Sequence, residues 1–384
     1  MKHVVFVNRF FHPDHSATSQ MLTDLALHLA ARGWEVDVVT SAQRYDDPSQ
    51  RLPPRDELRG VRISRVKATH FGRATLPGRA LDYLSFYVSA YRMLRKRARR
   101  GSVVVALTDP PLVSVVAMRA ARRGGAVVVN WIQDLCHEVA AGLGIRVPFA
   151  KSFRDASLRA ARINVAIGEL MARRVPKPRV RHNWADAALE PLAHDANPLR
   201  RDWSLGDAFV VGYSGNLGRA HEFDTILGAT KLVPEVRFLV IGGGARLAEV
   251  KKNAPENVEF RPYQPREILS QSLSAADVHL VSLQPQLEGL IVPSKFYGIL
   301  AVGRPVLFIG APDGELARLI DEHRCGVVVQ PGDVGGLAAA IRKLAHNRAD
   351  TREMGRRGRA LYDSQFAAPI ALAEWERILE EAAS

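Results

Sequence analysis

The stretch that decides the fold of this chain runs Glu288-Gly-Leu-Ile-Val-Pro-Ser-Lys-Phe-Tyr-Gly-Ile-Leu-Ala-Val-Gly-Arg-Pro-Val-Leu307. Pro293 and Ser294 can begin a helix, because proline suits a first turn and serine caps free N–H groups. Gly303 can end that helix in a left-handed conformation, and the proline two residues later prevents it from resuming. The apolar run at 306–309 is typical of a buried strand. The stretch therefore predicts a loop, a short helix and a strand, which is the repeating unit of an α/β domain.

An anion is the ligand that best suits the start of this helix. Ser294 and Lys295 lie there, where free amides, the helix dipole and the lysine ammonium converge on one point. The alternative is an ordinary crossover between strands that binds nothing. This stretch alone leaves both interpretations open.

Apolar runs and helical patterns alternate along the whole chain. Strands are predicted at 4–8, 36–40, 61–66, 103–107, 127–131, 163–167, 209–214, 236–241, 258–262, 278–283, 306–309 and 327–330. This alternation implies parallel sheets that are covered by helices on both faces. The expected fold class is α/β, with two doubly wound Rossmann-like domains that face each other across a cleft. We place an N-terminal domain at 1–187, a connection at 188–207, a C-terminal domain at 208–364 and a final helix, returning to the N-terminal domain, at 365–384.

Length and composition agree with two globular domains. A chain of 384 residues is too long for one ordinary core. Its two cysteines, Cys136 and Cys325, lie far apart without metal-ligand spacing, which is typical of a reducing cytoplasm. The first residues have no signal-peptide pattern, and no apolar run approaches the ~20 residues that span a bilayer. We therefore expect a cytoplasmic protein, either free or attached to the inner face of the cell membrane.

The net charge of +13 is concentrated in the first half of the chain. Residues 1–187 contain 31 Lys and Arg against 15 Asp and Glu, a net charge of +16, whereas residues 188–384 carry −3. The two halves are therefore expected to meet different partners. The densest basic cluster belongs to a helix predicted at 81–99 and its end, and consists of Arg92, Arg95, Lys96, Arg97, Arg99 and Arg100.

Aromatic residues precede this basic cluster on the same predicted helix. The combination favours the headgroup layer of an anionic membrane. The alternative is a solvated helix end whose arginines complement the helix dipole. Nucleic acid is not an expected partner, because no recognition motif accompanies the charge.

Two glycine-rich turns in the second half suit a phosphate group. Tyr-Ser-Gly-Asn-Leu-Gly-Arg at 213–219 and Ile-Gly-Gly-Gly-Ala-Arg at 241–246 each follow a predicted strand, where glycines let backbone amides approach a ligand closely. Neither turn has the spacing of a dinucleotide fingerprint, so NAD is not expected. Tyr263, in the loop after the next strand, is a candidate contact for a nucleobase. The candidate phosphate-binding and nucleotide-binding residues are Gly215, Asn216, Arg219, Gly243, Tyr263, Ser294 and Lys295.

Nearly the whole chain resembles the retaining glycosyltransferases of family 4. The resemblance rests on Pro-Ser-Lys and Ala-x-Gly-x-Pro-Val within 293–306, and on Phe-Phe-His-Pro-Asp-His-Ser-Ala-Thr at 10–18, Gln-Asp-Leu-Cys-His-Glu at 133–138 and Asn-Trp-Ala-Asp at 183–186. The chain is similar to bacterial transferases of exopolysaccharide and O-antigen assembly, of the colanic-acid and fucosaminyltransferase type. This resemblance implies the two-domain GT-B fold, a nucleoside-diphosphate sugar in the second domain and an acceptor in the first.

The substrates that the resemblance implies are a donor, which we expect to be a UDP-sugar, and a saccharide acceptor, free or carried on polyprenyl diphosphate. No separate cofactor is expected. No acidic pair of the DxD type follows a strand suitably, so the sequence does not require a metal.

Three residues are candidates for the transfer chemistry that the resemblance implies. Asp134 is expected to orient the acceptor hydroxyl, and the alternative is that it caps the helix that follows. His15 and Glu288 are expected to contact sugar hydroxyls.

The chain departs from the family pattern at the usual contacts to ribose and phosphate. The two family glutamates fall at Leu290 and Gly298, and the usual arginine and lysine fall at Asn216 and His221. Lys295, the arginine of the first glycine turn and backbone amides must therefore carry most of the phosphate charge.

The leading hypothesis is a glycosyltransferase that acts on a lipid-linked saccharide at the membrane face. A nucleotide-sugar 2-epimerase would share the architecture and would need no acceptor. A degenerate transferase that serves as a scaffold is the third alternative, because both family glutamates are absent.

Overall fold

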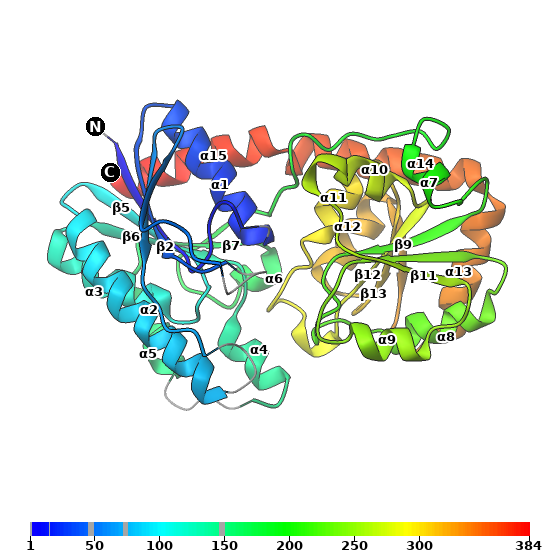
Figure 1. Ribbon diagram of the computed structural model, residues 1–384, viewed down its shortest axis with the longest axis horizontal. Coiled ribbons are helices and arrows are strands. Elements are labelled where there is room, and N and C mark those ends of the chain that lie inside the picture. The colour runs from blue at the N-terminus through cyan, green and yellow to red at the C-terminus, as the bar shows by residue number, and fades with distance from the viewer. Residues whose placement is uncertain (1, 15, 45–49, 72–75, 146–149) are drawn as a thin grey trace. The chain divides into compact units, whose positions relative to one another are not determined.

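The computed structural model describes residues 2–14, 16–44, 50–71, 76–145 and 150–384. It contains two compact α/β units (Figure 1). The first consists of Met1–His182 together with Ala371–Ser384, and the second of Asn183–Ile370. Residues 188–207, which the sequence predicts as a connection, pack within the second unit. There the buried Arg200 side chain donates hydrogen bonds to three backbone carbonyls.

The first unit is built on a sheet with the strand order β3-β4-β2-β1-β5-β6-β7-β8, which is parallel except between β3 and β4. Its strands are β1 (His3–Val7), β2 (Glu35–Ser41), β3 (Arg55–Leu58), β4 (Val61–Val66), β5 (Ser102–Ala106), β6 (Val127–Ile132), β7 (Ile163–Ala166) and β8 (Pro178–Val180). The structure confirms the six strands predicted for this half. It adds β3 and β8, which are largely exposed edge strands without an apolar run.

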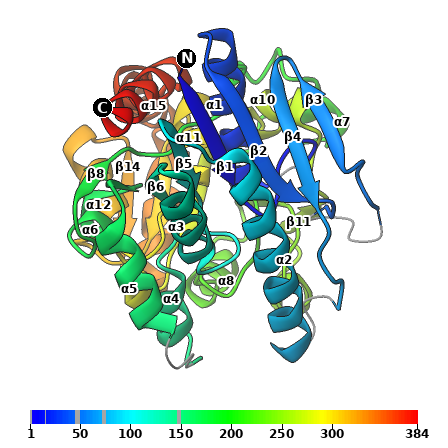
Figure 2. The ribbon, with the colours of Figure 1, turned by 90° about the vertical axis from the view of Figure 1, so that its left-hand side faces the viewer.

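Helices cover this sheet on both faces, as the apolar strands require. They are α1 (Ala17–Ala31), α2 (Leu76–Arg97), α3 (Val113–Gly124), α4 (Cys136–Gly142), α5 (Ala150–Ala160), α6 (Glu169–Ala172) and the C-terminal α15 (Ala368–Ala383). Figure 2 shows α2, α3 and α5 side by side on one face.

The end of the chain belongs to the first unit. Trp375 of α15 packs against Trp131 of β6 with ring centroids 4.5 Å apart, and both rings are fully buried. Glu376 accepts a hydrogen bond from Trp34 Nε1 at 3.2 Å. The apolar face of α15 is therefore part of the first core.

The second unit has a fully parallel sheet with the strand order β11-β10-β9-β12-β13-β14. Its strands are β9 (Val210–Ser214), β10 (Arg237–Ile241), β11 (Val258–Arg261), β12 (Val278–Ser282), β13 (Val306–Ile309) and β14 (Gly326–Val329), all within one residue of the predicted limits. Its helices are α7 (Pro198–Asp202), α8 (Asp224–Leu232), α9 (Leu247–Asn253), α10 (Leu269–Ser274), α11 (Lys295–Ala301), α12 (Glu315–His323), α13 (Val334–His346) and α14 (Arg348–Leu361). The order of the strands reverses between β9 and β12, and ligands of such sheets bind at the carboxyl edge of that switch point.

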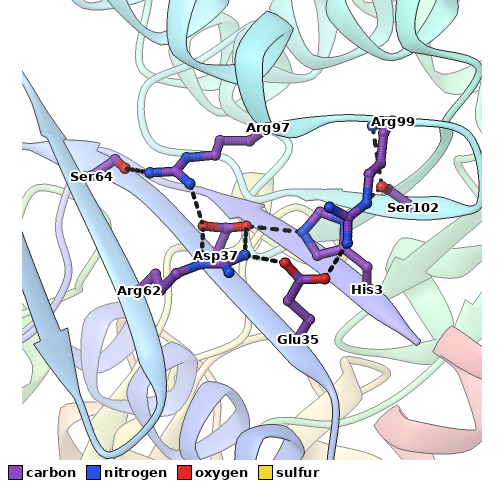
Figure 3. Close-up of polar contacts among 8 residues, drawn as sticks. All are labelled: His3, Glu35, Asp37, Arg62, Ser64, Arg97, Arg99 and Ser102. Carbon is purple, nitrogen blue, oxygen red and sulfur yellow. Dashed lines mark hydrogen bonds and ion pairs between the residues drawn. The ribbon is translucent and has the colours of Figure 1, made fainter. Parts of the chain in front are cut away.

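A network of charges, buried at His3 and Asp37 and more exposed at its arginines, links the strands at the amino edge of the first sheet (Figure 3). His3 lies between Ser102 Oγ and Asp37 Oδ2, at 2.7 and 2.9 Å from its ring nitrogens. Arg62 donates to both Asp37 and Glu35 at 2.6 Å. Burial opposes ionisation of Asp37, but hydrogen bonds from His3 and Arg62 outweigh it and lower the pKa of Asp37 to about 2. Although His3, Glu35 and Asp37 lie close enough to share a cation, arginine satisfies both carboxylates, so this is an ion-pair network.

This network also changes the interpretation of the basic cluster at the end of α2. Arg97 lies 3.6 Å from Asp37 and donates to Ser64 Oγ, and Arg99 forms an ion pair with Glu35. These two arginines are neutralised by acids of the sheet, contrary to the expectation that the whole cluster is available to a partner. Arg92, Arg95 and the other two basic residues remain exposed.

Candidate active site

The two predicted glycine turns lie against each other at the carboxyl edge of the second sheet. The Gly215 amide donates to the Ile241 carbonyl at 2.9 Å. A Cβ on Gly242 would lie 2.1 Å from the Gly215 carbonyl oxygen, and one on Gly244 would lie 2.4 Å from Asn216 Oδ1. The three glycines also have φ values of +132°, +140° and +137°, which side chains rarely adopt. Glycine is therefore required here for the two turns to pack together.

Lys295 is the cation of this region. Its Nζ lies 3.7 Å from the centroid of the Tyr213 ring, in a cation–π contact. A Cβ on Gly215 would lie 3.5 Å from Lys295 Cε, so the lysine passes directly against the first glycine turn. Its Nζ is buried and has no hydrogen-bond partner among the described residues. Burial lowers the pKa of Lys295 to about 7. The structure thus brings the Pro-Ser-Lys segment and the glycine turns together around the buried Lys295 amine, whose hydrogen bonds are unused by the described residues.

The helix that carries Lys295 begins differently from the expectation. Ser294 has φ −62° and ψ −23° and makes no capping hydrogen bond with its side chain. A capping serine needs an extended backbone, whereas this one already has helical geometry, so the predicted cap is wrong. Gly303 ends the segment with φ +63°, as predicted. α11 has only seven residues, so its dipole is weak. The positive charge at the start of this helix therefore comes from the Lys295 side chain.

His221 follows the first glycine turn and is a neutral side chain. Its Nδ1 lies 2.6 Å from the Ser282 carbonyl oxygen, to which it donates. Burial and the charge of Lys295 lower the pKa of His221 to about 3. The position where the family resemblance places a cation therefore holds an uncharged imidazole. Lys295 is left as the buried cation of the site.

The remaining predicted donor contacts lie at the surface of the same edge. Asn216 and Arg219 are exposed on the first turn. Tyr263 is 59% exposed, and a Cβ on Gly243 would lie 3.3 Å from its ring, so the ring covers the second turn. Gln284, in the loop after β12, donates to the carbonyl of Arg219 at 3.0 Å and fixes the first turn from the other side of the switch point.

Glu288 lies against the start of α12. Its Oε1 accepts a hydrogen bond from the Glu315 amide at 2.8 Å, and a Cβ on Gly314 would lie 2.5 Å from its Oε2. Burial raises the pKa of Glu288. The carboxylate that the sequence assigns to sugar hydroxyls thus binds a helix N-terminus.

This contact gives a prediction for Glu288. Glu288→Ala should lower the free energy of unfolding by about 1 kcal/mol, the usual effect of removing a cap, while Glu288→Gln keeps an acceptor and should change it less. Denaturant unfolding and turnover would be measured for both variants. A glutamine variant that unfolds normally but loses turnover would instead support the sugar contact.

The positions of the missing family glutamates are apolar. Leu290 is buried, and a Cβ on Gly298 would contact Leu273 and Leu189 at 3.5 and 3.8 Å. A carboxylate on Gly298 would begin in an apolar environment, where an unpaired charge is costly.

Asp134 lies at the carboxyl edge of the first sheet, in the loop after β6. The following helix begins at Cys136 with Leu135 at the N-cap position and no side-chain cap, so the helix-cap alternative for Asp134 is wrong. Burial and the negative charge of Asp109 raise the pKa of Asp134 to about 6. His15, the other candidate predicted for this domain, lies outside the described residues.

Two functional candidates of this edge were missed from the sequence. Asp109 follows β5, the neighbour of β6, and Arg9 follows β1. The buried Arg9 guanidinium packs over the rings of Phe10 and Tyr83 at 5.2 and 5.3 Å. Each residue lies within three positions of the end of a predicted strand. Because the carboxyl ends of parallel strands meet at one edge of the sheet, this position could have identified both residues from the sequence.

Comparisons with known proteins match two successive domains of the chain. Residues 17–184 match a glycosyl transferase 4-like domain, and residues 208–347 match the glycosyl transferases group 1 family. The chain is 29% identical over 299 residues to a probable glycosyltransferase, WbjE, of Pseudomonas aeruginosa, covering 73% of this chain and 74% of the relative. It is 25% identical to the putative colanic acid biosynthesis glycosyl transferase WcaI of Escherichia coli, covering 87% and 89%.

A further relative is the GDP-mannose:cellobiosyl-diphosphopolyprenol alpha-mannosyltransferase of Xanthomonas oryzae, which is 25% identical and covers 91% of this chain and 90% of the relative. Among solved structures, sucrose-phosphate synthase from Thermosynechococcus elongatus has a TM-score of 0.82 at 18% identity, with both chains fully covered. Anabaena HepE in complex with UDP-glucose has a TM-score of 0.74 at 15% identity, covering 99% and 100%. These likenesses confirm the expected GT-B fold. With a glycosyl transferase 4-like domain at 17–184 followed by a glycosyl transferases group 1 domain at 208–347, the chain belongs to the glycosyltransferases.

Proposed function

We propose that this protein moves a sugar from a UDP-sugar, with retention of configuration, to a saccharide carried on polyprenyl diphosphate during synthesis of a bacterial surface polysaccharide. The observation that carries the donor half is the buried Nζ of Lys295, which has no hydrogen-bond partner among the described residues and lies beside two packed glycine turns. An ammonium and backbone amides preorganised at the leaving phosphate stabilise the charge that develops there. These groups supply that charge without a metal, so we propose that transfer is metal-independent.

The relatives support the other parts of the proposal. The Xanthomonas relative is named for a diphosphopolyprenol acceptor, and the Escherichia coli relative for colanic acid biosynthesis. Anabaena HepE was solved with UDP-glucose, which supports the UDP-sugar donor, and the Xanthomonas relative is named for GDP-mannose, which belongs in the panel of donors tested below. The departing phosphate accepts the acceptor proton on the same face of the sugar, and Asp134 orients the acceptor hydroxyl.

A panel of nucleotide sugars tests the donor. A donor present at 100 times its dissociation constant stabilises the fold by about 2.7 kcal/mol, so one UDP-sugar should raise the melting temperature clearly. Incubation with that donor alone should leave its sugar unchanged, because transfer needs an acceptor. Epimerised sugar would identify the 2-epimerase alternative, and a chain that no nucleotide sugar stabilises would be the scaffold.

We also propose that α2 brings the first unit to an anionic membrane surface. Leu81, Leu84 and Val88 are 49%, 58% and 43% exposed, and Arg92 and Arg95 continue the same helical stripe. Apolar side chains followed by cations on one face suit the headgroup layer. Within the described residues, no helix has the length and apolar character needed to cross a bilayer. We therefore propose peripheral attachment at the cytoplasmic face.

Charge reversal tests this attachment. Arg92→Glu with Arg95→Glu should abolish sedimentation with vesicles of anionic phospholipid, since each basic residue near such a surface contributes about 1 kcal/mol. Salt should weaken the wild-type interaction as the Debye length falls below about 8 Å. Reversal of the exposed Lys252 and Lys343 in the second unit is the matched control. If the wild-type protein does not sediment with these vesicles at low salt, the exposed stripe of α2 has a partner other than an anionic membrane.

A further inference from the structure

A cavity of about 860 Å³ lies in the second unit, apart from the glycine turns. Two of its lining residues, Asp277 and Pro305, directly precede β12 and β13, so it opens at the amino edge of the sheet. The glycine turns follow β9 and β10 at the carboxyl edge. The volume is within the range of small-molecule sites, and nothing in the donor chemistry uses this edge.

The floor of the cavity carries more positive than negative charge. Arg200 is buried and Arg304 half-buried, and each donates to three backbone carbonyls. The carboxylate between them, Asp277, lies 3.7 Å from Arg200 and also accepts from the Val210 amide at 2.8 Å. Burial lowers the pKa of both arginines. The described lining holds five arginines against three carboxylates, Asp195, Asp207 and Asp277, so an added anion would balance the excess positive charge.

The walls of the cavity hold arginine side chains with unused N–H groups. Among the described residues, the exposed side chains of Arg201 and Arg352 have no hydrogen bond or ion pair, and Arg348 makes one hydrogen bond, to the Asp207 carbonyl. His194 also lines the cavity: its Nδ1 lies 3.8 Å from Asp277 Oδ1, and its buried Nε2 has no hydrogen-bond partner within the part of the chain that the structure describes. A planar guanidinium with unused N–H groups pairs well with phosphate oxygens.

We propose that this cavity binds a phosphorylated small molecule of the sugar-phosphate class, with its phosphate held by Arg201, Arg348 and Arg352. The cavity is much larger than a phosphate ion, so the organic part of the ligand fills the remainder beside His194. This site is separate from the proposed donor site and does not depend on it.

Calorimetry with glucose 1-phosphate tests the site. The titration uses the Lys295→Ala protein, in which the proposed donor site is disabled. Adding Arg201→Gln and Arg352→Gln should weaken glucose 1-phosphate binding at least about tenfold, the effect of losing one charged hydrogen bond. Adding Lys231→Gln and Lys343→Gln, on exposed lysines outside the cavity, should leave it unchanged.

Titration with inorganic phosphate shows whether the cavity recognises the phosphate group alone or the whole sugar phosphate. Glucose 1-phosphate that binds more tightly than phosphate supports the sugar-phosphate class, and equal affinity overturns it. Absence of binding, or binding that the two arginine substitutions do not change, overturns the site. Circular dichroism of each variant shows whether lost binding reflects unfolding, and a weakened but folded arginine variant supports the proposal.

Discussion

Lys295→Ala should weaken the binding of UDP and of the UDP-sugar donor by about 1.5–3 kcal/mol, or roughly 10- to 150-fold, the range for a hydrogen bond to a charged group. The expected loss is large because, among the described residues of the two glycine turns and α11, Lys295 is the cation whose charged atom is buried without a hydrogen-bond partner, whereas Arg246 is already paired with Glu249. His221 is neutral, since burial and the lysine charge lower the pKa of His221 to about 3. Isothermal calorimetry near pH 6.5, where the free lysine is mostly protonated, measures the effect directly.

The affinity for UDP should also depend on pH through Lys295. In the free protein, burial lowers the pKa of Lys295 to about 7, so the amine is largely neutral at pH 8. A bound diphosphate stabilises the ammonium and raises that pKa, so binding at pH 8 takes up a proton and the affinity falls as the pH rises above about 7. Calorimetry in buffers of different ionisation enthalpy detects the proton.

Two comparisons make the lysine result specific. Lys295→Arg should restore only part of the affinity, because a planar guanidinium does not fit the space of a compact ammonium. Lys252→Ala, at an exposed site on α9, should bind UDP as the wild-type protein does. Equal UDP affinity in the Lys295→Ala and wild-type proteins would remove Lys295 from the donor site.

The sheets and the donor edge were predictable because their signals are local. Fully buried parallel strands are continuous apolar runs, so even their limits agree with the sequence within one residue. The glycine turns follow those strands directly, and β9 and β12 flank the point where the strand order reverses. β3 and β8 escaped prediction because edge strands need no apolar pattern.

The chemistry of individual groups was less predictable, because it depends on residues distant in sequence. Glu288 was predicted as a contact to sugar hydroxyls, and the structure adds a hydrogen bond from the Glu315 amide, 27 positions away, that no local pattern indicates. The neutrality of His221 depends on its burial and on Lys295. Four of the six residues of the predicted basic cluster are exposed cations, and the other two are paired with acids of the sheet such as Glu35, which no local sequence pattern reveals.

Asp134→Asn should reduce turnover by about 10²- to 10⁴-fold, the usual contribution of a group that assists proton transfer. UDP binding should not change, because Asp134 belongs to the first unit and the glycine turns to the second. Stability should not fall either. Burial and Asp109 raise the pKa of Asp134 from 3.8 to about 6, so its ionisation destabilises the fold as the pH rises through that interval, and asparagine removes this effect.

The pH profile separates this role from a structural one. Wild-type turnover should fall below about pH 6, where Asp134 becomes protonated and can no longer accept the hydrogen bond of the acceptor hydroxyl. Asp109→Asn removes the neighbouring negative charge, so it should lower the pKa of Asp134 and move this inflection to a lower pH while turnover at neutral pH persists. The Asp134→Asn protein should lack the inflection. Full turnover in that variant would show that the carboxylate does not touch the acceptor, and a loss of stability with normal chemistry would make Asp134 a structural residue of the loop after β6.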